Sequence, residues 1–241
     1  MGDLPEGETW SEESIAAEPA VDRAASLGLS VCLVTAGGFL DGYTFVGHGH
    51  VFTNAMTGNV VLLGIEVISF QPQQALNHLT PLLTVVVGIW AARALHLRAK
   101  DRGKPSPYSA VLLWEIGILF VVSLLPASCP DFVITTCVVF AASLQVQTFR
   151  TVLGHAYTST FTTGNLRNLS EAIFDWVTHP ALRKESRNKA RIFAIICACF
   201  LLGATLGSYA TRKLGNHALW VELALLVLAL QRVRARSAPS A

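Results

Sequence analysis

Long apolar segments recur along this chain and leave few folds open to it. They occur at about 27–46, 78–97, 108–125, 131–149, 191–210 and 217–233, and each is close to the roughly 20 residues that an α-helix needs to cross a bilayer. Apolar residues make up 52% of the 241 residues and charged residues only 14%, a composition typical of membrane proteins rather than of a soluble core. The sequence therefore predicts an all-α polytopic membrane protein.

A short polar motif interrupts this apolar pattern twice. Residues 52–59 read FTNAMTGN, and 106 residues later residues 158–165 read TSTFTTGN. In each copy Thr-Gly-Asn precedes a helical stretch, 60–70 or 166–177, that is too short or too polar for a crossing of about 20 residues. Because irregular backbone at membrane depth requires burial in protein or a cavity, both stretches are predicted to be re-entrant half-helices.

The two halves of the chain align around these motifs. Residues 112–115 (LLWE) correspond to residues 219–222 (LWVE), and Gly88 corresponds to Gly203. Each half is then a long helix, a half-helix and two further long helices. The predicted divisions are a disordered acidic tail (1–27), a first membrane repeat (28–125), a second membrane repeat (131–233) and a basic tail (234–241).

The distribution of Lys and Arg orients these segments. With six crossings and two re-entrant half-helices, 16 of the 18 basic residues fall on the side of the two termini. With eight crossings, the basic insert at 183–191 and the basic C-terminus fall outside, against the rule that cytoplasmic loops are enriched in Lys and Arg. Six crossings with both termini cytoplasmic are therefore predicted. Three crossings in each half make the repeats inverted, an arrangement that recurs among transporters.

The two half-helix starts provide the candidate binding residues. A helix start has unpaired backbone N–H groups and the positive end of the helix dipole, and Thr and Asn add uncharged polar groups. The same residue types also have a structural interpretation, because Thr and Asn cap helices and Gly permits close packing. The candidate solute-binding residues are Asn54, Thr57, Gly58, Asn59, Thr163, Gly164 and Asn165.

Three acidic residues within the apolar segments are candidates for binding a coupling ion. Glu115 and Glu222 occupy equivalent positions in the two halves, and Asp41 lies in the first segment. Ionisable groups are costly at membrane depth and often mark proton or ion pathways. For the two glutamates, an interfacial position with a polar partner is the alternative. The glycines around Asp41 also predict that the second half of the first helix is broken or unwound.

Catalytic and cofactor motifs are absent from the sequence. It contains no phosphate-binding loop, dinucleotide-binding glycine pattern or zinc-protease motif, so no enzyme activity, cofactor or metal site is expected. The basic loops lack the interleaved aromatic residues of single-strand nucleic-acid binders. Membrane lipid and an unidentified small solute are the expected partners, and a homo-oligomer stays open.

Two stretches of the first half resemble a known family. Residues 37–43 (GGFLDGY) and 52–64 (FTNAMTGNVVLLG) are similar to the YoaK-like bacterial inner-membrane proteins, which contain domain of unknown function 1275. Residues 160–166 (TFTTGNL) also fit this family, and the resemblance covers about 28–233. Gly42 differs, because a small residue such as Ala is expected there more often. The resemblance implies a multi-pass location in the bacterial inner (plasma) membrane and no particular substrate.

These observations favour a small-solute secondary transporter. Thr57, Asn59, Thr163 and Asn165 would line its central site, and Asp41 or Glu115 would bind a coupling proton. A channel or facilitator has the same arrangement of crossings and half-helices, and in that case both glutamates are structural. A membrane scaffold without transport is the third interpretation.

Overall fold

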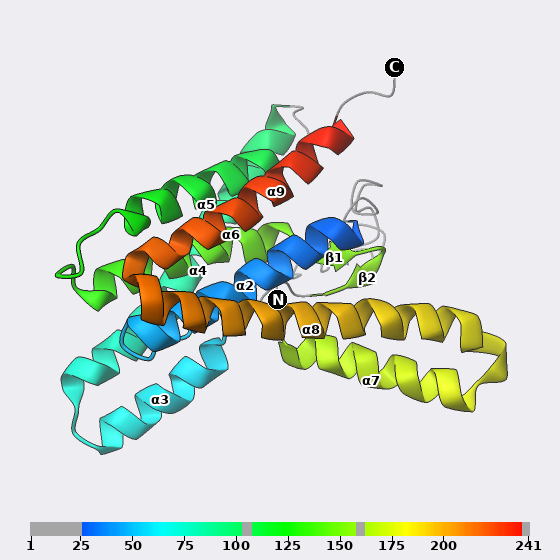
Figure 1. Ribbon diagram of the computed structural model, residues 1–241, viewed down its shortest axis with the longest axis horizontal. Coiled ribbons are helices and arrows are strands. Elements are labelled where there is room, and N and C mark those ends of the chain that lie inside the picture. The colour runs from blue at the N-terminus through cyan, green and yellow to red at the C-terminus, as the bar shows by residue number, and fades with distance from the viewer. Residues whose placement is uncertain (1–25, 103–107, 158–161, 238–241) are drawn as a thin grey trace, which may run out of the picture.

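The computed structural model describes residues 26–102, 108–157 and 162–237, almost entirely as helices (Figure 1). The expected acidic tail lies almost wholly outside these residues, as do the first four residues of the second motif. The elements are α2 (Leu27–Gly47), α3 (Met56–Ile68), α4 (Pro72–Asp101), α5 (Tyr108–Ser123), α6 (Asp131–Thr148), β1 (Thr151–Val152), β2 (His155–Ala156), α7 (Thr162–Thr178), η2 (Pro180–Leu182), α8 (Arg183–Leu214), η3 (Gly215–Ala218) and α9 (Leu219–Ser237).

The prediction of an all-α membrane protein is confirmed. Within the described ranges, four helical stretches are long and apolar enough to cross a membrane: Leu27–Gly47, Pro72–Ala99, Asp131–Thr148 and Pro180–Ala235, the last of which covers α8 and nearly all of α9. The helices α3 and α5 are apolar but shorter. Large apolar side chains such as Trp90, Trp114 and Trp220 are exposed on the outside of the bundle, as expected where the surroundings are lipid.

One local expectation is wrong. The helix α2 stays continuous through its glycines, because they serve close packing and do not break the helix. The basic insert at 183–191 forms the first turns of α8. Its Arg, Lys, Glu and Ala residues are good helix formers, so the stretch extends the apolar helix that follows it.

Small residues bring the backbones of α2 and α8 into contact. A Cβ atom at Gly38 would overlap the carbonyl of Phe200, and one at Gly203 would overlap the carbonyl of Thr35. Further along, a Cβ atom at Gly42 would likewise overlap the carbonyl of Ala204 and the backbone nitrogen of Ser208. Later residues of α2 thus face later residues of α8, so the two helices run in the same direction. Such close small-residue packing is a main source of helix association in lipid.

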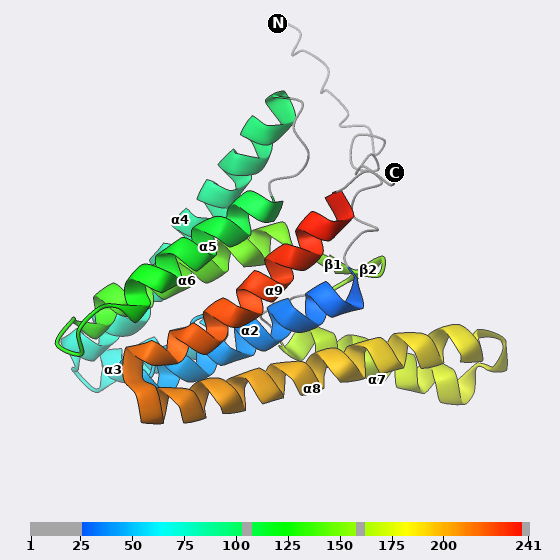
Figure 2. The same cartoon turned by 45° about the horizontal axis from the view of Figure 1, so that its top comes forward.

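The remaining helices pack in pairs around these two (Figure 2). The helix α6 packs against α4 and α5, α9 packs against α2 and α5, α3 packs against α4, and α7 packs against α8. Both views show α7 and the first half of α8 extending beyond the rest of the bundle.

Polar contacts join three connections at one end of the bundle. The Tyr43 hydroxyl donates to Asn216 Oδ1 (2.9 Å), and Asn216 Nδ2 donates to the carbonyl of Leu125 (3.0 Å). His48 Nδ1 lies 2.9 Å from Asp131 Oδ1. The end of α2, the connection from α5 to α6, and η3 therefore lie together.

Contacts at the opposite end join the other helix termini. The rings of Tyr108 and Phe149 lie 5.2 Å apart, so the start of α5 meets the end of α6. Gly28, at the start of α2, adjoins the Arg232 side chain near the end of α9. Successive long helices thus begin and end at alternating ends of the bundle.

Candidate functional site

The segment between α2 and α3 runs back along α2 instead of away from it. Asn54 Nδ2 donates to the carbonyl of Gly37 (2.9 Å), and the Asn54 N–H donates to Asp41 Oδ1 (2.7 Å). Thr53 Oγ1 lies 2.9 Å from Thr44 Oγ1. Because Gly37 lies in the middle of α2, the helix α3 begins halfway along the bundle.

The far end of α3 returns toward the end of α2. There Glu66 Oε2 lies 2.8 Å from His78 Nδ1 of α4, and His78 Nε2 lies 3.3 Å from the carbonyl of His50. The chain between His50 and His78 therefore enters the bundle, reverses, and leaves on the side from which it entered. A re-entrant position of this half-helix in the membrane stays a prediction.

Asn59 closes the turn before α3 by hydrogen bonding to backbone. Its Oδ1 accepts the N–H of Phe52 (2.9 Å), and its Nδ2 donates to the carbonyl of Phe52 (2.7 Å). The side chain is completely buried. Gly58 lies against the Phe52 ring, where a Cβ atom would come within 2.8 Å of Cδ2. Both residues of the motif therefore position the half-helix.

Replacing Asn59 by Ala should destabilise the fold, because the N–H and carbonyl of Phe52 would lose their partner inside the protein. We expect the free energy of unfolding to fall by about 1–3 kcal/mol, measured as a lower melting temperature in detergent. Asn168→Ala is the matched control, because Asn168 makes one exposed hydrogen bond, to the carbonyl of Ala156 at 3.4 Å. Equal melting temperatures for the two variants would contradict the assigned role of Asn59.

The second half-helix, α7, repeats the burial pattern of the first. Asn165 is 1% exposed, as Asn59 is buried in the first copy, whereas Thr163 and Gly164 are exposed. Residues 158–161, which precede α7, lie outside the described residues. In each copy the asparagine is therefore buried within the protein, whereas the threonine stays accessible.

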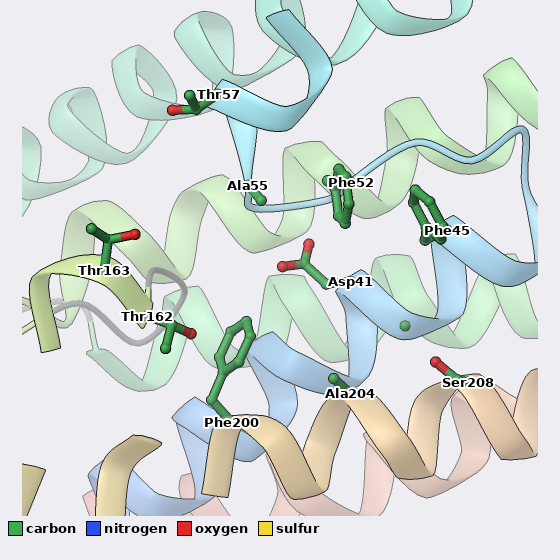
Figure 3. A pocket seen from close by; sticks show the side chains of 11 residues that line it. Asp41, Phe45, Phe52, Ala55, Thr57, Thr162, Thr163, Phe200, Ala204 and Ser208 are labelled. Atoms are coloured by element: carbon green, nitrogen blue, oxygen red, sulfur yellow. The ribbon is translucent and has the colours of Figure 1, made fainter. Parts of the chain in front are cut away.

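Both half-helix starts face one cavity of about 380 Å³ (Figure 3). Thr57 comes from the first turn of α3, and Thr162 and Thr163 come from the first turn of α7. The remaining wall belongs to α2, α8 and the segment before α3. The lining residues are Asp41, Gly42, Phe45, Phe52, Ala55, Thr57, Thr162, Thr163, Phe200, Ala204 and Ser208.

Asp41 is the carboxylate that lines this cavity. In Figure 3 its carboxyl group lies between Ala55, just before α3, and the ring of Phe200. Besides the hydrogen bond from Asn54, the backbone N–H groups of Thr53 and Ala55 interact with the Asp41 carboxyl. The residue therefore both fixes the segment before α3 and presents an ionisable group to the cavity.

The structure brings together some of the predicted site residues and separates others. Thr57, Thr163 and Asp41 meet at the cavity. Asn54 and Asn59 bond to backbone behind it, as described above. The remaining coupling candidates, Glu115 and Glu222, lie on α5 and α9, and neither of these helices lines the cavity.

The aromatic and small residues of the cavity were not predicted as site residues. Phe45, Phe52 and Phe200 form apolar walls, and Ala204 and Ser208 line the cavity from α8. One signal in the sequence could have identified the last two, since small residues four apart form a stripe on one helix face. The phenylalanines give no such signal, because apolar residues are common throughout this chain.

Comparison with known proteins identifies a family. The family described as "Protein of unknown function (DUF1275)" matches residues 29–231. The chain is similar to the UPF0700 transmembrane protein YoaK of Bacillus subtilis (strain 168), with 27% identity over 201 residues, which are 82% of this chain and 89% of YoaK. No solved structure matches the chain. The resemblance inferred from the two motifs is confirmed.

Proposed function

This chain belongs to the DUF1275 family of multi-pass membrane proteins, and from that premise we propose that it is a secondary transporter of a small solute. The observation that supports the proposal most directly is the meeting of both half-helix starts and Asp41 at one cavity. Two helix starts direct N–H groups and positive dipole ends toward a bound solute. Midplane sites between broken helices are a recurrent feature of secondary transporters.

The residues around the cavity suggest a division of roles. Thr57 and Thr163 offer hydroxyl groups beside the helix starts, and these would bind an anionic or strongly polar group of the solute. Asp41 would bind the coupling proton. The phenylalanine walls would hold an apolar part of the solute and limit access of water. No catalytic step, cofactor or metal enters the proposal.

The proposed membrane arrangement is two inverted repeats with three crossings each. Exchanging α2, α3, α4 and α5 for α6, α7, α8 and α9 leaves the pattern of packed helix pairs unchanged, which supports a two-fold relation. The alternation of helix ends between the two ends of the bundle supports six crossings. The distribution of basic residues supports a cytoplasmic position for both termini, and we propose that the chain lies in the inner membrane of a bacterial cell.

Cysteine labelling tests this arrangement. In a chain whose five native cysteines are replaced, Gln73→Cys and Lys184→Cys each introduce one thiol at an exposed position. An impermeant maleimide added to intact spheroplasts should label Cys at 73 at once, and Cys at 184 only after the membrane is permeabilised. Inverted half-helices require these opposite sides, so labelling of both positions from one side would overturn the arrangement.

Transport is tested with the purified protein in liposomes that contain the pH-sensitive dye pyranine. A panel of amino acids and small carboxylic acids is added under an inward proton gradient. A transported solute should accelerate acidification of the lumen, and Thr57→Val combined with Thr163→Val should remove this effect. Solute flux that does not depend on the proton gradient would favour the channel or facilitator. No flux, together with a partner that co-purifies in fixed ratio, would favour the scaffold.

A further inference from the structure

Two glutamates outside the cavity are buried where the two halves of the chain meet. Glu115 on α5 and Glu222 on α9 are both 0% exposed, and their helices pack against each other. The two carboxyl groups interact electrostatically. Within the part of the chain that the structure describes, none of their four oxygens has a hydrogen-bond partner.

The surroundings of this pair are apolar on both helices. Residues three before and four after each glutamate share its helix face. For Glu115 these are Leu112 and Leu119, and for Glu222 they are Leu219 and Leu226. All four leucines are buried, at 0 or 1% exposure. The pair therefore lies in a leucine-lined contact that offers no compensating polar group from these positions.

Two ionised carboxylates are not compatible with such a site. A buried charge without partner or solvation costs several kcal/mol, and two like charges side by side add repulsion, so that such a pair retains a proton. A metal ion such as Ca²⁺ requires about six to eight oxygen ligands, whereas the pair provides four. A proton needs no further ligand.

We propose that Glu115 and Glu222 form a proton-binding site at the contact between α5 and α9, separate from the cavity. The pair holds one proton or two, and it is neutral or singly charged when the helices are packed. Loss of the last proton leaves two negative charges at the contact, and their repulsion separates α5 from α9. The proposal concerns protonation of this contact and does not depend on solute transport.

Other titratable groups on the packed elements belong to other contacts. Those on the helices around the pair are Cys32, Asp41 and Tyr43 on α2, Tyr108 on α5, Asp131 and Cys137 on α6, His217 on η3, and Arg232 and Arg234 on α9. Tyr43 bonds to Asn216, and Asp131 pairs with His48. Of the described groups, Glu222 is the one whose charge acts on Glu115.

Carbodiimide labelling tests the site without knowledge of a solute. Dicyclohexylcarbodiimide enters apolar sites and reacts with protonated carboxyl groups to form a stable N-acylurea, which mass spectrometry locates by peptide. Adducts are expected on the peptides of α5 and α9 in the full chain in detergent. Above the titration midpoint, each pH unit should lower their yield about tenfold, in line with the protonated fraction.

Glutamine variants separate this proposal from a structural role. E115Q combined with E222Q should lose these adducts and keep the fold, since Gln preserves shape and is neutral. E66Q is the matched control, because Glu66 pairs with His78, and it should leave labelling of α5 and α9 unchanged. The melting temperature of the native chain should fall as the pH rises from 6 to 9, and that of the double variant should fall less.

Three results would overturn the proposal. One is absence of adducts on α5 and α9 in the folded chain at low pH. Another is protection of these adducts by Na⁺ or Ca²⁺ at constant pH, which would indicate a metal-ion site in place of a proton site. The third is an equal fall in melting temperature for the native chain and the double glutamine variant.

Discussion

Replacing Asp41 by Asn should abolish accumulation of solute against its gradient, to the level of protein-free liposomes. The amide cannot release or bind the coupling proton, so the proton gradient no longer drives uptake. The fold should survive, because the amide oxygen can still accept the hydrogen bond that Asp41 Oδ1 now takes from the Asn54 N–H at 2.7 Å. Two assays are made. The first measures uptake of the solute under an inward proton gradient, and the second measures exchange of labelled for unlabelled solute without a gradient.

The two assays distinguish the possible roles of Asp41. A carboxyl group that binds only the proton leaves exchange intact in the Asn variant, whereas a group that binds the solute abolishes exchange as well. Asp131→Asn is the control, since Asp131 pairs with His48 at the end of the bundle and its side chain is 49% exposed. Full accumulation by the Asp41→Asn variant would exclude Asp41 as the coupling residue.

The positions of the two short helices could be predicted from the sequence because they depend on repeated patterns. Thr-Gly-Asn at Asn59 and again at Asn165 is a local signal, and a helical stretch too short to cross a membrane follows each copy. The structure places the start of each following helix, α3 and α7, at the same cavity. Helix length and repetition are properties of the chain itself, so they can be read without knowing which helices touch.

The direction in which each side chain points could not be predicted from these repeated patterns. Within one turn, Thr57 points to the cavity and Asn59 points to the backbone of Phe52. The rotation of α3 that decides between them is set by the Phe52 ring against Gly58 and by the contact of Asn54 with Gly37. Both contacts depend on the path of the segment before α3, which has no periodic pattern.

The misreading of the first helix has a similar cause. A glycine permits both a break in its own helix and the close approach of a second helix. Which of the two occurs depends on whether a second helix packs there. For Gly38 that partner is Phe200, 162 residues later in the chain, whose carbonyl occupies the space that a side chain would need. Long-range packing of this kind stabilises α2 as one helix and places Asp41 beside α8.

Cysteines at Thr57 and Thr163 should be joined by a short bis-methanethiosulfonate reagent in an otherwise cysteine-free chain. Both side chains line the same cavity of about 380 Å³, and both residues are exposed, so the reagent can reach each thiol. With a protease site inserted at 103–107, the crosslinked fragments should stay together on a denaturing gel after cleavage. We expect nearly complete linkage within the chain.

The matched control pairs Gln73→Cys with Thr163→Cys, because Gln73 lies at the start of α4, beyond the far end of α3. This pair should give separate fragments under the same conditions. The crosslink between the half-helix starts should also block transport, since alternating access requires the repeats to move about the site, and a reducing agent should restore it. Separate fragments from the Thr57–Thr163 pair would show that the two motifs do not form one site. Full transport by the crosslinked chain would leave the shared cavity intact but place the moving parts elsewhere in the bundle.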